Sequence, residues 1–128
     1  MERITTCIVL ESKNLKETLY FYEGILGFKP SKERPQLRVT GVWYDIDSTR
    51  ICFVVNRNFG GYREDITSSC KEIYLRTQNI EQIKKKLKFY QISFVEEHYD
   101  EEVSITFYDP DRYKLQIVSK ETMEESLL

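Results

Sequence analysis

Two stretches of this chain repeat one pattern of residues at an offset of 65 positions. Residues 6–19 read TCIVLESKNLKETL, and residues 71–84 read KEIYLRTQNIEQIK. At this offset Ile8 aligns with Ile73. Asn14 and Asn79 also coincide, and in each copy an alternation of apolar and polar residues precedes this asparagine, which is typical of a helix start. An offset of about half the chain predicts a duplicated α+β module.

The first copy predicts a strand, a helix and a hairpin. The alternation covers residues 3–10, and the helix after it is capped by Asn14, with Glu17 as its capping-box partner. Gly27 is a typical helix-ending glycine. Residues 29–38 contain two prolines, which favours a loop or a short edge strand. A hairpin follows, with strands over residues 42–46 and 51–56.

The second copy predicts the same order of elements. A strand over residues 72–76 precedes a helix that Asn79 caps, with Gln82 as its partner. Three further strands are predicted over residues 92–95, 103–108 and 113–118. Each half is therefore predicted as βαβββ. The strand residues expected to pack against the helices are Ile4, Ile8, Leu10, Ile51, Phe53, Val55, Ile73, Leu75, Leu115 and Ile117. The helix residues expected to meet them are Leu15, Leu19, Tyr22, Leu26, Ile80, Ile83 and Leu87.

Length and composition limit the kind of protein. At 128 residues the chain can bury a core without disulfides, which predicts a single domain over 1–128. The net charge of −2 disfavours nucleic-acid binding, and no apolar run approaches the roughly 20 residues of a membrane span. Three cysteines without paired spacing, and a start without a signal-peptide pattern, favour a cytoplasmic location. The predicted parts are module 1 (about 1–58), a connector (about 59–70), module 2 (about 71–119) and a tail (120–128).

Several short motifs make the chain similar to a known superfamily. They are Asn14-Leu15, Phe21-Tyr22, Leu26-Gly27-Phe28, and Tyr108-Asp109-Pro110-Asp111 before Tyr113-Lys114-Leu115-Gln116-Ile117. Over essentially its whole length the chain resembles the vicinal oxygen chelate superfamily, which contains glyoxalases, bleomycin resistance proteins and extradiol dioxygenases. The resemblance implies an α+β fold in which two βαβββ modules form a curved mixed sheet with a concave cup. It also implies a homodimer, since such modules pair across a two-fold axis. Arg112 stands where the last turn usually has glycine, which predicts a different turn conformation.

The resemblance also assigns four inward positions that carry His or Glu in metal-dependent members. In this chain they fall on Cys7, Val54, Glu72 and Gln116. Valine cannot bind a metal, and a neutral amide is a poor ligand for zinc, nickel, manganese or iron. The only histidine, His98, lies in an acidic run that is expected at a hairpin tip. We therefore expect no metal and no other cofactor, and we disfavour metal-dependent glyoxalase, epimerase and dioxygenase chemistry.

Two cysteines offer a different metal site. Cys7 and Cys52 fall on strands that are neighbours in this superfamily, and together with Glu72 they would make a credible zinc-binding set. Free cysteine is also among the most buried residue types, so the filling of two strand positions is the favoured interpretation.

Glu72 is the candidate catalytic residue. It is expected to point into the cup with Tyr74 and Arg76, where partly apolar surroundings would let it act as a general base or bind a cationic group. An ion pair with Arg76, or with an arginine of the connector, is an equally open alternative. Trp43 shares the inward phase of Val54, so Trp43 and Tyr74 could stack on a flat ligand, although core filling is favoured for each.

The leading hypothesis is a metal-independent binding protein that holds an unidentified aromatic or cationic organic molecule in the cup, as drug-sequestering members of the fold do. One alternative is a lyase or isomerase that uses Glu72 as general base, with Cys7 as a metal ligand or nucleophile. A second is a non-catalytic regulatory or interaction module. Neither a nucleic acid nor a membrane is expected as a partner. The candidate ligand-binding residues are Cys7, Trp43, Cys52, Val54, Glu72, Tyr74, Arg76 and Gln116.

Overall fold

The elements of the computed structural model follow the repeat in the sequence. The structure describes residues 4–32, 40–61 and 72–119, so most of the predicted connector and the whole predicted tail lie outside it. The first half contains β1 (Thr6–Ser12), α1 (Leu15–Leu19), the π-helix η1 (Tyr20–Ile25), β2 (Gly41–Ile46) and β3 (Thr49–Val55). The second half contains β4 (Glu72–Thr77), α2 (Ile80–Phe89), β5 (Val95–Tyr99), β6 (Glu102–Tyr108) and β7 (Lys114–Ser119). None of the helices in these residues is long and apolar enough to cross a membrane.

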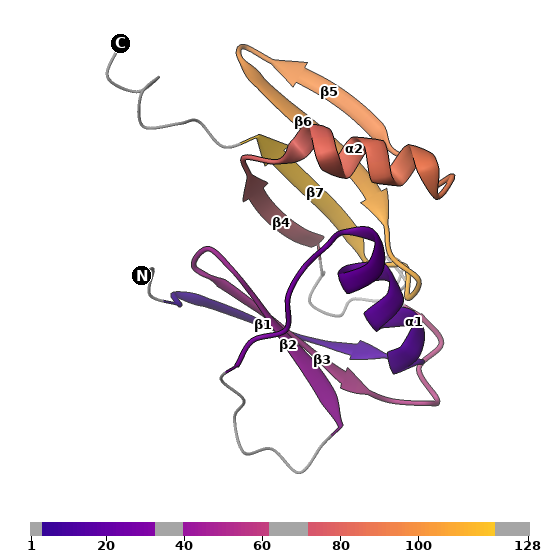
Figure 1. Cartoon of the computed structure of the whole chain (residues 1–128). Helices are drawn as coiled ribbons and strands as arrows, with labels where there is room; N and C mark the ends of the chain where they lie inside the picture. The colour runs from indigo at the N-terminus through magenta and orange to yellow at the C-terminus, as the bar shows by residue number, and fades with distance from the viewer. Residues whose placement is uncertain (1–3, 33–39, 62–71, 120–128) are drawn as a thin grey trace.

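Both halves build a sheet with the same connectivity (Figure 1). In the first, β1 pairs in parallel with β3, which pairs antiparallel with β2. In the second, β4 pairs in parallel with β7, and β6 and β5 follow in antiparallel order. Pro30 pairs antiparallel with Tyr44 of β2 in a single β-bridge. It therefore lies beside β2 as β5 lies beside β6 in the second half. The protein therefore has an α+β fold with two βαβββ-like modules and mixed sheets, as the repeat predicts.

Several strand boundaries differ from the prediction, for example those of β1, β5 and β7. β1 begins at Thr6 and ends at Ser12, two residues later than the predicted end, and β7 begins at Lys114 rather than at Tyr113. β5 covers Val95–Tyr99, so much of the acidic run is an edge strand rather than a hairpin tip. An edge strand has only one partner, and here all five of its residues are exposed, so charged side chains are tolerated there.

The first helix begins and ends as predicted, but its second part, Tyr20–Ile25, is a π-helix. Asn14 Oδ1 accepts a hydrogen bond from the Glu17 backbone at 3.3 Å, and Gly27 ends the helix in the left-handed region with φ 77°. Between them, the wider turns of η1 shift the buried stripe. The buried residues are Thr18, Phe21, Tyr22, Ile25 and Leu26, while the predicted core positions Leu15 and Leu19 are only half-buried.

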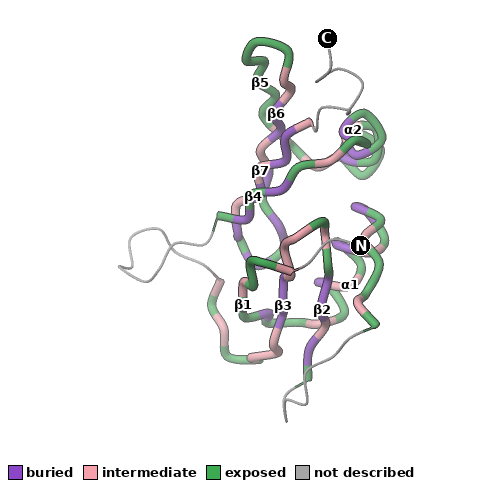
Figure 2. Tube along the Cα trace, turned by 90° about the vertical axis from the view of Figure 1, so that its left-hand side faces the viewer, coloured by how far each residue is buried: buried purple, intermediate pink, exposed green. Residues whose placement is uncertain are grey.

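The core lies between the sheets and the helices, which cover the same side of both sheets (Figure 2). Twelve of the predicted core residues are buried: Leu10, Tyr22, Leu26, Ile51, Phe53, Ile73, Leu75, Ile80, Ile83, Leu87, Leu115 and Ile117. Ile8 is partly buried and packs against them. The prediction was wrong for Ile4 and Val55, which lie at the ends of the sheet pattern and are half-buried outside this cluster. Six residues of the buried cluster are absent from the predicted list: Phe21, Ile25, Tyr44, Ile105, Phe107 and Tyr113.

Side chains of the last turn join the two modules. The Tyr113 hydroxyl donates to the Glu11 carbonyl at 2.9 Å and accepts from the Glu11 amide at 3.0 Å. Tyr22 of η1 donates to Asp109 at 2.6 Å. Arg112 has φ 74°, the left-handed region that glycine favours. Arg112 therefore adopts the backbone conformation that glycine favours at this position, and φ gives no sign of the expected change of turn conformation.

Candidate ligand-binding face

The side of the sheets opposite the helices carries the predicted site residues, and we call it the helix-free face. Along each strand they alternate with buried residues such as Phe53 and Ile73, which pack toward the helices. The residues that share the helix-free face are Cys7, Trp43, Cys52, Val54, Glu72, Tyr74, Arg76 and Gln116. The first four belong to the sheet of the first module and the last four to that of the second.

The two cysteines are neighbours on this face. Their Sγ atoms lie 3.8 Å apart, with Cys7 exposed and Cys52 buried. Burial raises the pKa of the Cys52 thiol to about 12, so that it stays protonated at neutral pH. Within the residues that the structure describes, no His, Asp or Glu joins them in a cluster of three metal-binding side chains, and the zinc set with Glu72 is not assembled.

Trp43 and Tyr74 differ sharply in exposure. Trp43 is 2% exposed and therefore fills space, which is the interpretation that the sequence favours. Tyr74 is 47% exposed. A flat ligand can therefore lie against the ring of Tyr74 but not against that of Trp43, so the expected stacking of both rings on one ligand is not available.

Glu72 does not have the surroundings that the sequence analysis expects. It is the first residue of β4, an edge strand, and its side chain is exposed across from Lys114 of β7 instead of lying in a partly apolar cup. The ionic partner of Arg76 is Glu102 of β6, with Nη1 and Oε1 3.1 Å apart. The Arg76 guanidinium also lies 5.9 Å from the centre of the Tyr74 ring, which favours a fixed position of that ring.

A second exposed tyrosine lies on the same face. Tyr108, at the end of β6, is 54% exposed, and the strand register places it beside Lys114. Tyr74 lies beside Gln116, whose amide nitrogen donates to Ser104 at 3.1 Å. The sequence analysis did not include Tyr108 or Lys114 among the site residues. The alternation along residues 103–108 contains the signal, because Tyr108 has the same phase as Ser104.

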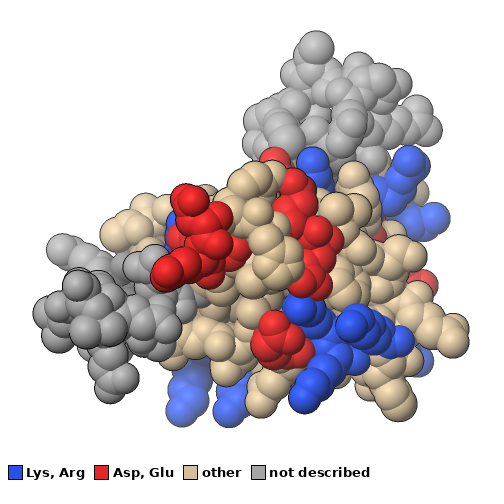
Figure 3. Space-filling model, turned by 90° about the horizontal axis from the view of Figure 1, so that it is seen from above, with Lys and Arg blue, Asp and Glu red and all other residues tan. Residues whose placement is uncertain are grey.

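Acidic and basic side chains gather in separate groups on one face of the molecule (Figure 3). Acidic side chains cluster over the β5–β6 hairpin, and lysines line α2. Lys84 connects the two groups, since its ammonium lies 3.0 Å from Glu96 and 3.2 Å from Glu81. His98 contacts Glu96 at 2.7 Å, so the one histidine of the chain belongs to this surface network rather than to the helix-free face.

Comparison with known proteins agrees with this architecture. The model of the Glyoxalase/Bleomycin resistance protein/Dioxygenase superfamily matches residues 6–117. No curated protein sequence gives a significant match. A glyoxalase/dioxygenase from Nostoc punctiforme is similar in structure, with a TM-score of 0.77, 16% identity, and coverage of 94% of this chain and 92% of the other.

Two other solved structures have the same fold at lower similarity. One is a fosfomycin resistance protein from Mesorhizobium loti, with a TM-score of 0.60, 14% identity, and coverage of 100% of this chain and 99% of the other. The other is a lactoylglutathione lyase from Agrobacterium tumefaciens, with a TM-score of 0.64, 10% identity, and coverage of 90% and 92%. At such identities the likeness concerns the fold alone, whereas the family match covers most of the sequence. The chain belongs to the glyoxalase/bleomycin resistance protein/dioxygenase superfamily.

Proposed function

We propose that this protein binds a small aromatic organic molecule on its helix-free face without using a metal ion. The superfamily's metal positions correspond, by the resemblance described above, to Cys7, Val54, Glu72 and Gln116. Val54 has no donor atom, and the amide of Gln116 is a poor ligand that already holds Ser104. Because this donor set does not fit a metal, we infer that the chain lacks an intact metal-ligand set.

The observation that carries the proposal is the pair of exposed tyrosines on a strand scaffold. Tyr74 and Tyr108 offer large, rigid rings, which are well suited to stacking on a flat molecule. Glu72 lies on the same strand as Tyr74, so a cationic group on the ligand would meet a carboxylate there. An aromatic cation is therefore the class of ligand that best matches these side chains.

The enzyme hypothesis has weaker support. Glu72 is exposed to water, and the strand register places Lys114 across from it rather than Cys7, the nucleophile of that hypothesis. A regulatory or interaction module remains the alternative if no small molecule binds.

A fluorescence titration with 9-aminoacridine, an aromatic cation, tests the proposal. Acridine, which is mostly neutral at pH 7.5, and choline, which is not aromatic, serve as comparison compounds. We expect saturable binding of 9-aminoacridine that survives treatment with a chelator, weaker binding of acridine and no binding of choline. Tyr74→Ala should lower the affinity by roughly tenfold, consistent with the contribution of one stacked ring.

The matched control is Tyr20→Ala, since Tyr20 is 59% exposed but lies on η1, on the helix side. Equal losses in the two variants would indicate non-specific stacking and contradict the proposal. Stoichiometric zinc, nickel or manganese in the purified protein would contradict the metal-independent part of it.

We also propose that two copies of the chain form a homodimer. Val9, Val95 and Tyr99 are about 60% exposed on the helix-free face, which leaves apolar surface for a second copy to cover. Light scattering at micromolar concentration should give twice the 15.3 kDa of one chain. A mass of one chain would contradict this proposal and leave the binding proposal intact.

A further inference from the structure

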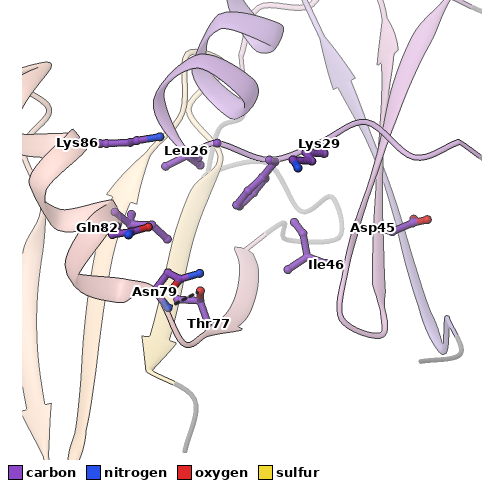
Figure 4. Close-up of a pocket in the computed structure, with 11 residues that line it drawn as sticks. Leu26, Lys29, Asp45, Ile46, Thr77, Asn79, Gln82 and Lys86 are labelled. Atoms are coloured by element: carbon purple, nitrogen blue, oxygen red, sulfur yellow. Dashed lines mark hydrogen bonds between the residues drawn. The ribbon is translucent and has the colours of Figure 1, made fainter. Parts of the chain in front are cut away.

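A cleft of about 330 Å³ lies between the two modules, on the helix side of the sheets and apart from the helix-free face (Figure 4). The first module contributes the residues that follow η1, beginning with its C-cap Leu26, and the end of β2. The second contributes the end of β4 and the first turns of α2. This volume is within the range of small-molecule binding sites.

The cleft has an apolar lining from both modules. Leu26 and Phe28 come from the first helix and the segment after it, and Ile46 comes from the end of β2. Ile83 of α2 lines the cleft from the second module. Leu26 and Ile83 are buried, and Phe28 and Ile46 are partly buried against the core, so these four side chains form a fixed surface.

The polar groups of the cleft are mainly hydrogen-bond donors. Lys29 and Lys86 bring two ammonium groups, and Asn79 and Gln82 bring side-chain amides. The Lys86 side chain extends toward Leu26 (Figure 4). Its Nζ lies close to Gly27, 3.2 Å from the position that the Cβ atom of any other residue would take there. The Asn79 side chain makes no helix-capping hydrogen bond, so its amide can reach a ligand.

The carboxylate among the lining residues does not balance this positive charge. Asp45 points away from the cleft (Figure 4). Its oxygens lie 2.7 Å from Arg50 Nε and 2.7 Å from the hydroxyl of Ser31. The charge of Asp45 is therefore compensated on the other side of β2, and the cleft keeps a net positive character.

We propose that this cleft is a second binding site, which takes a small organic anion with an apolar group. A carboxylate or phosphate would accept charge-assisted hydrogen bonds from Lys86 and Lys29 and neutral ones from Asn79. The apolar group would lie against Leu26 and Ile83. Because the ligand would contact both modules at once, its binding would also hold them together and raise the melting temperature.

The probes for the test are 4-phenylbutyrate and phenyl phosphate, with 4-phenylbutyramide as a neutral counterpart and inorganic phosphate as the anion alone. Isothermal titration at low salt should give saturable binding of both organic anions. The neutral amide and inorganic phosphate should bind more weakly, since each lacks one half of the recognition.

Three variants locate the site. Lys86→Gln should lower the affinity for 4-phenylbutyrate by about tenfold, the loss expected for one partly exposed charged hydrogen bond. Lys29→Gln should also lower this affinity. Lys85→Gln makes the same charge change one residue away on α2, outside the cleft, and should have no effect.

Two results would overturn the proposal: no saturable binding of either organic anion, or equal losses in Lys86→Gln and Lys85→Gln. Lys86 also lies beside the end of η1, so the folding of Lys86→Gln is checked by its melting temperature. If that variant does not fold, the comparison of Lys29→Gln with Lys85→Gln decides. Tyr74→Ala should leave anion binding unchanged, which separates this proposal from the one for the helix-free face.

Discussion

Asp109 should make the stability of this protein depend on pH. Its carboxylate is 6% exposed in the joint between the modules. One oxygen accepts from the Tyr22 hydroxyl at 2.6 Å, and the other accepts from the backbone amides of Asp111 and Tyr113 at 2.9 Å each. Burial nevertheless dominates and raises the pKa of Asp109 to about 6, from 3.8.

The sign and size of the effect follow from this pKa. The folded protein binds the proton more tightly than the unfolded chain, so the stabilisation is complete below about pH 4 and is lost as the pH rises through 6. A shift of about two units, at about 1.4 kcal/mol per unit, gives a loss of about 3 kcal/mol in the free energy of unfolding.

Asp109→Asn isolates this contribution, because asparagine has the same shape and does not titrate. Its carbonyl oxygen can accept from both backbone amides, and its NH₂ can donate to Tyr22. Urea unfolding of both proteins between about pH 4 and pH 7.5 gives two stability curves. The free energy of unfolding of the natural protein minus that of Asp109→Asn should fall by about 3 kcal/mol across this range. A difference that is independent of pH would refute the reasoning.

Three further substitutions test the joint, the last turn and the core by urea unfolding. Tyr113→Phe leaves the Glu11 amide and carbonyl without their partner and should cost about 1–3 kcal/mol; no loss would contradict the role of this hydroxyl. Arg112→Gly should stabilise the protein by roughly 1 kcal/mol, because glycine adopts φ 74° without strain, and a destabilised variant would contradict this. Ile83→Ala should cost about 2–5 kcal/mol and half-buried Leu19→Ala clearly less, so equal losses would count against the observed burial pattern.

The sequence predicted the parts of the fold that depend on short-range patterns. The strands around Ile8 and Ile73 and the helix start at Asn14 follow from alternation and capping, which act within a few residues. The second helix also begins after Asn79, but the predicted cap was wrong there, since the Asn79 side chain makes no capping hydrogen bond. The π-helix could not be predicted in this way. The spacing of Leu15, Leu19, Tyr22 and Leu26 fits an ordinary α-helix, and only packing against the sheet selects the wider turns over Tyr20–Ile25.

In the candidate site, too, local patterns predicted some features, while others depend on how distant parts of the chain pack. Alternation along each strand correctly assigned Cys52, Tyr74 and Gln116 to the side opposite the helices. It could not tell that Trp43 is covered while Tyr108 is open, because exposure depends on which other parts of the chain lie over a residue. The cleft beside Lys86 is also absent from any local pattern, since its walls come from two modules.

The pairing pattern of the strands also bears on how the chain folds. Thr6 pairs with Thr49 in the first sheet and Glu72 with Lys114 in the second, so each sheet closes within its own half of the chain. The described bonds between the halves, such as that of Tyr113 to Glu11, instead join residues 87 to 102 positions apart and involve side chains. Short closures cost less chain entropy and form sooner. We therefore expect the two sheets to form first and their docking to complete the native state.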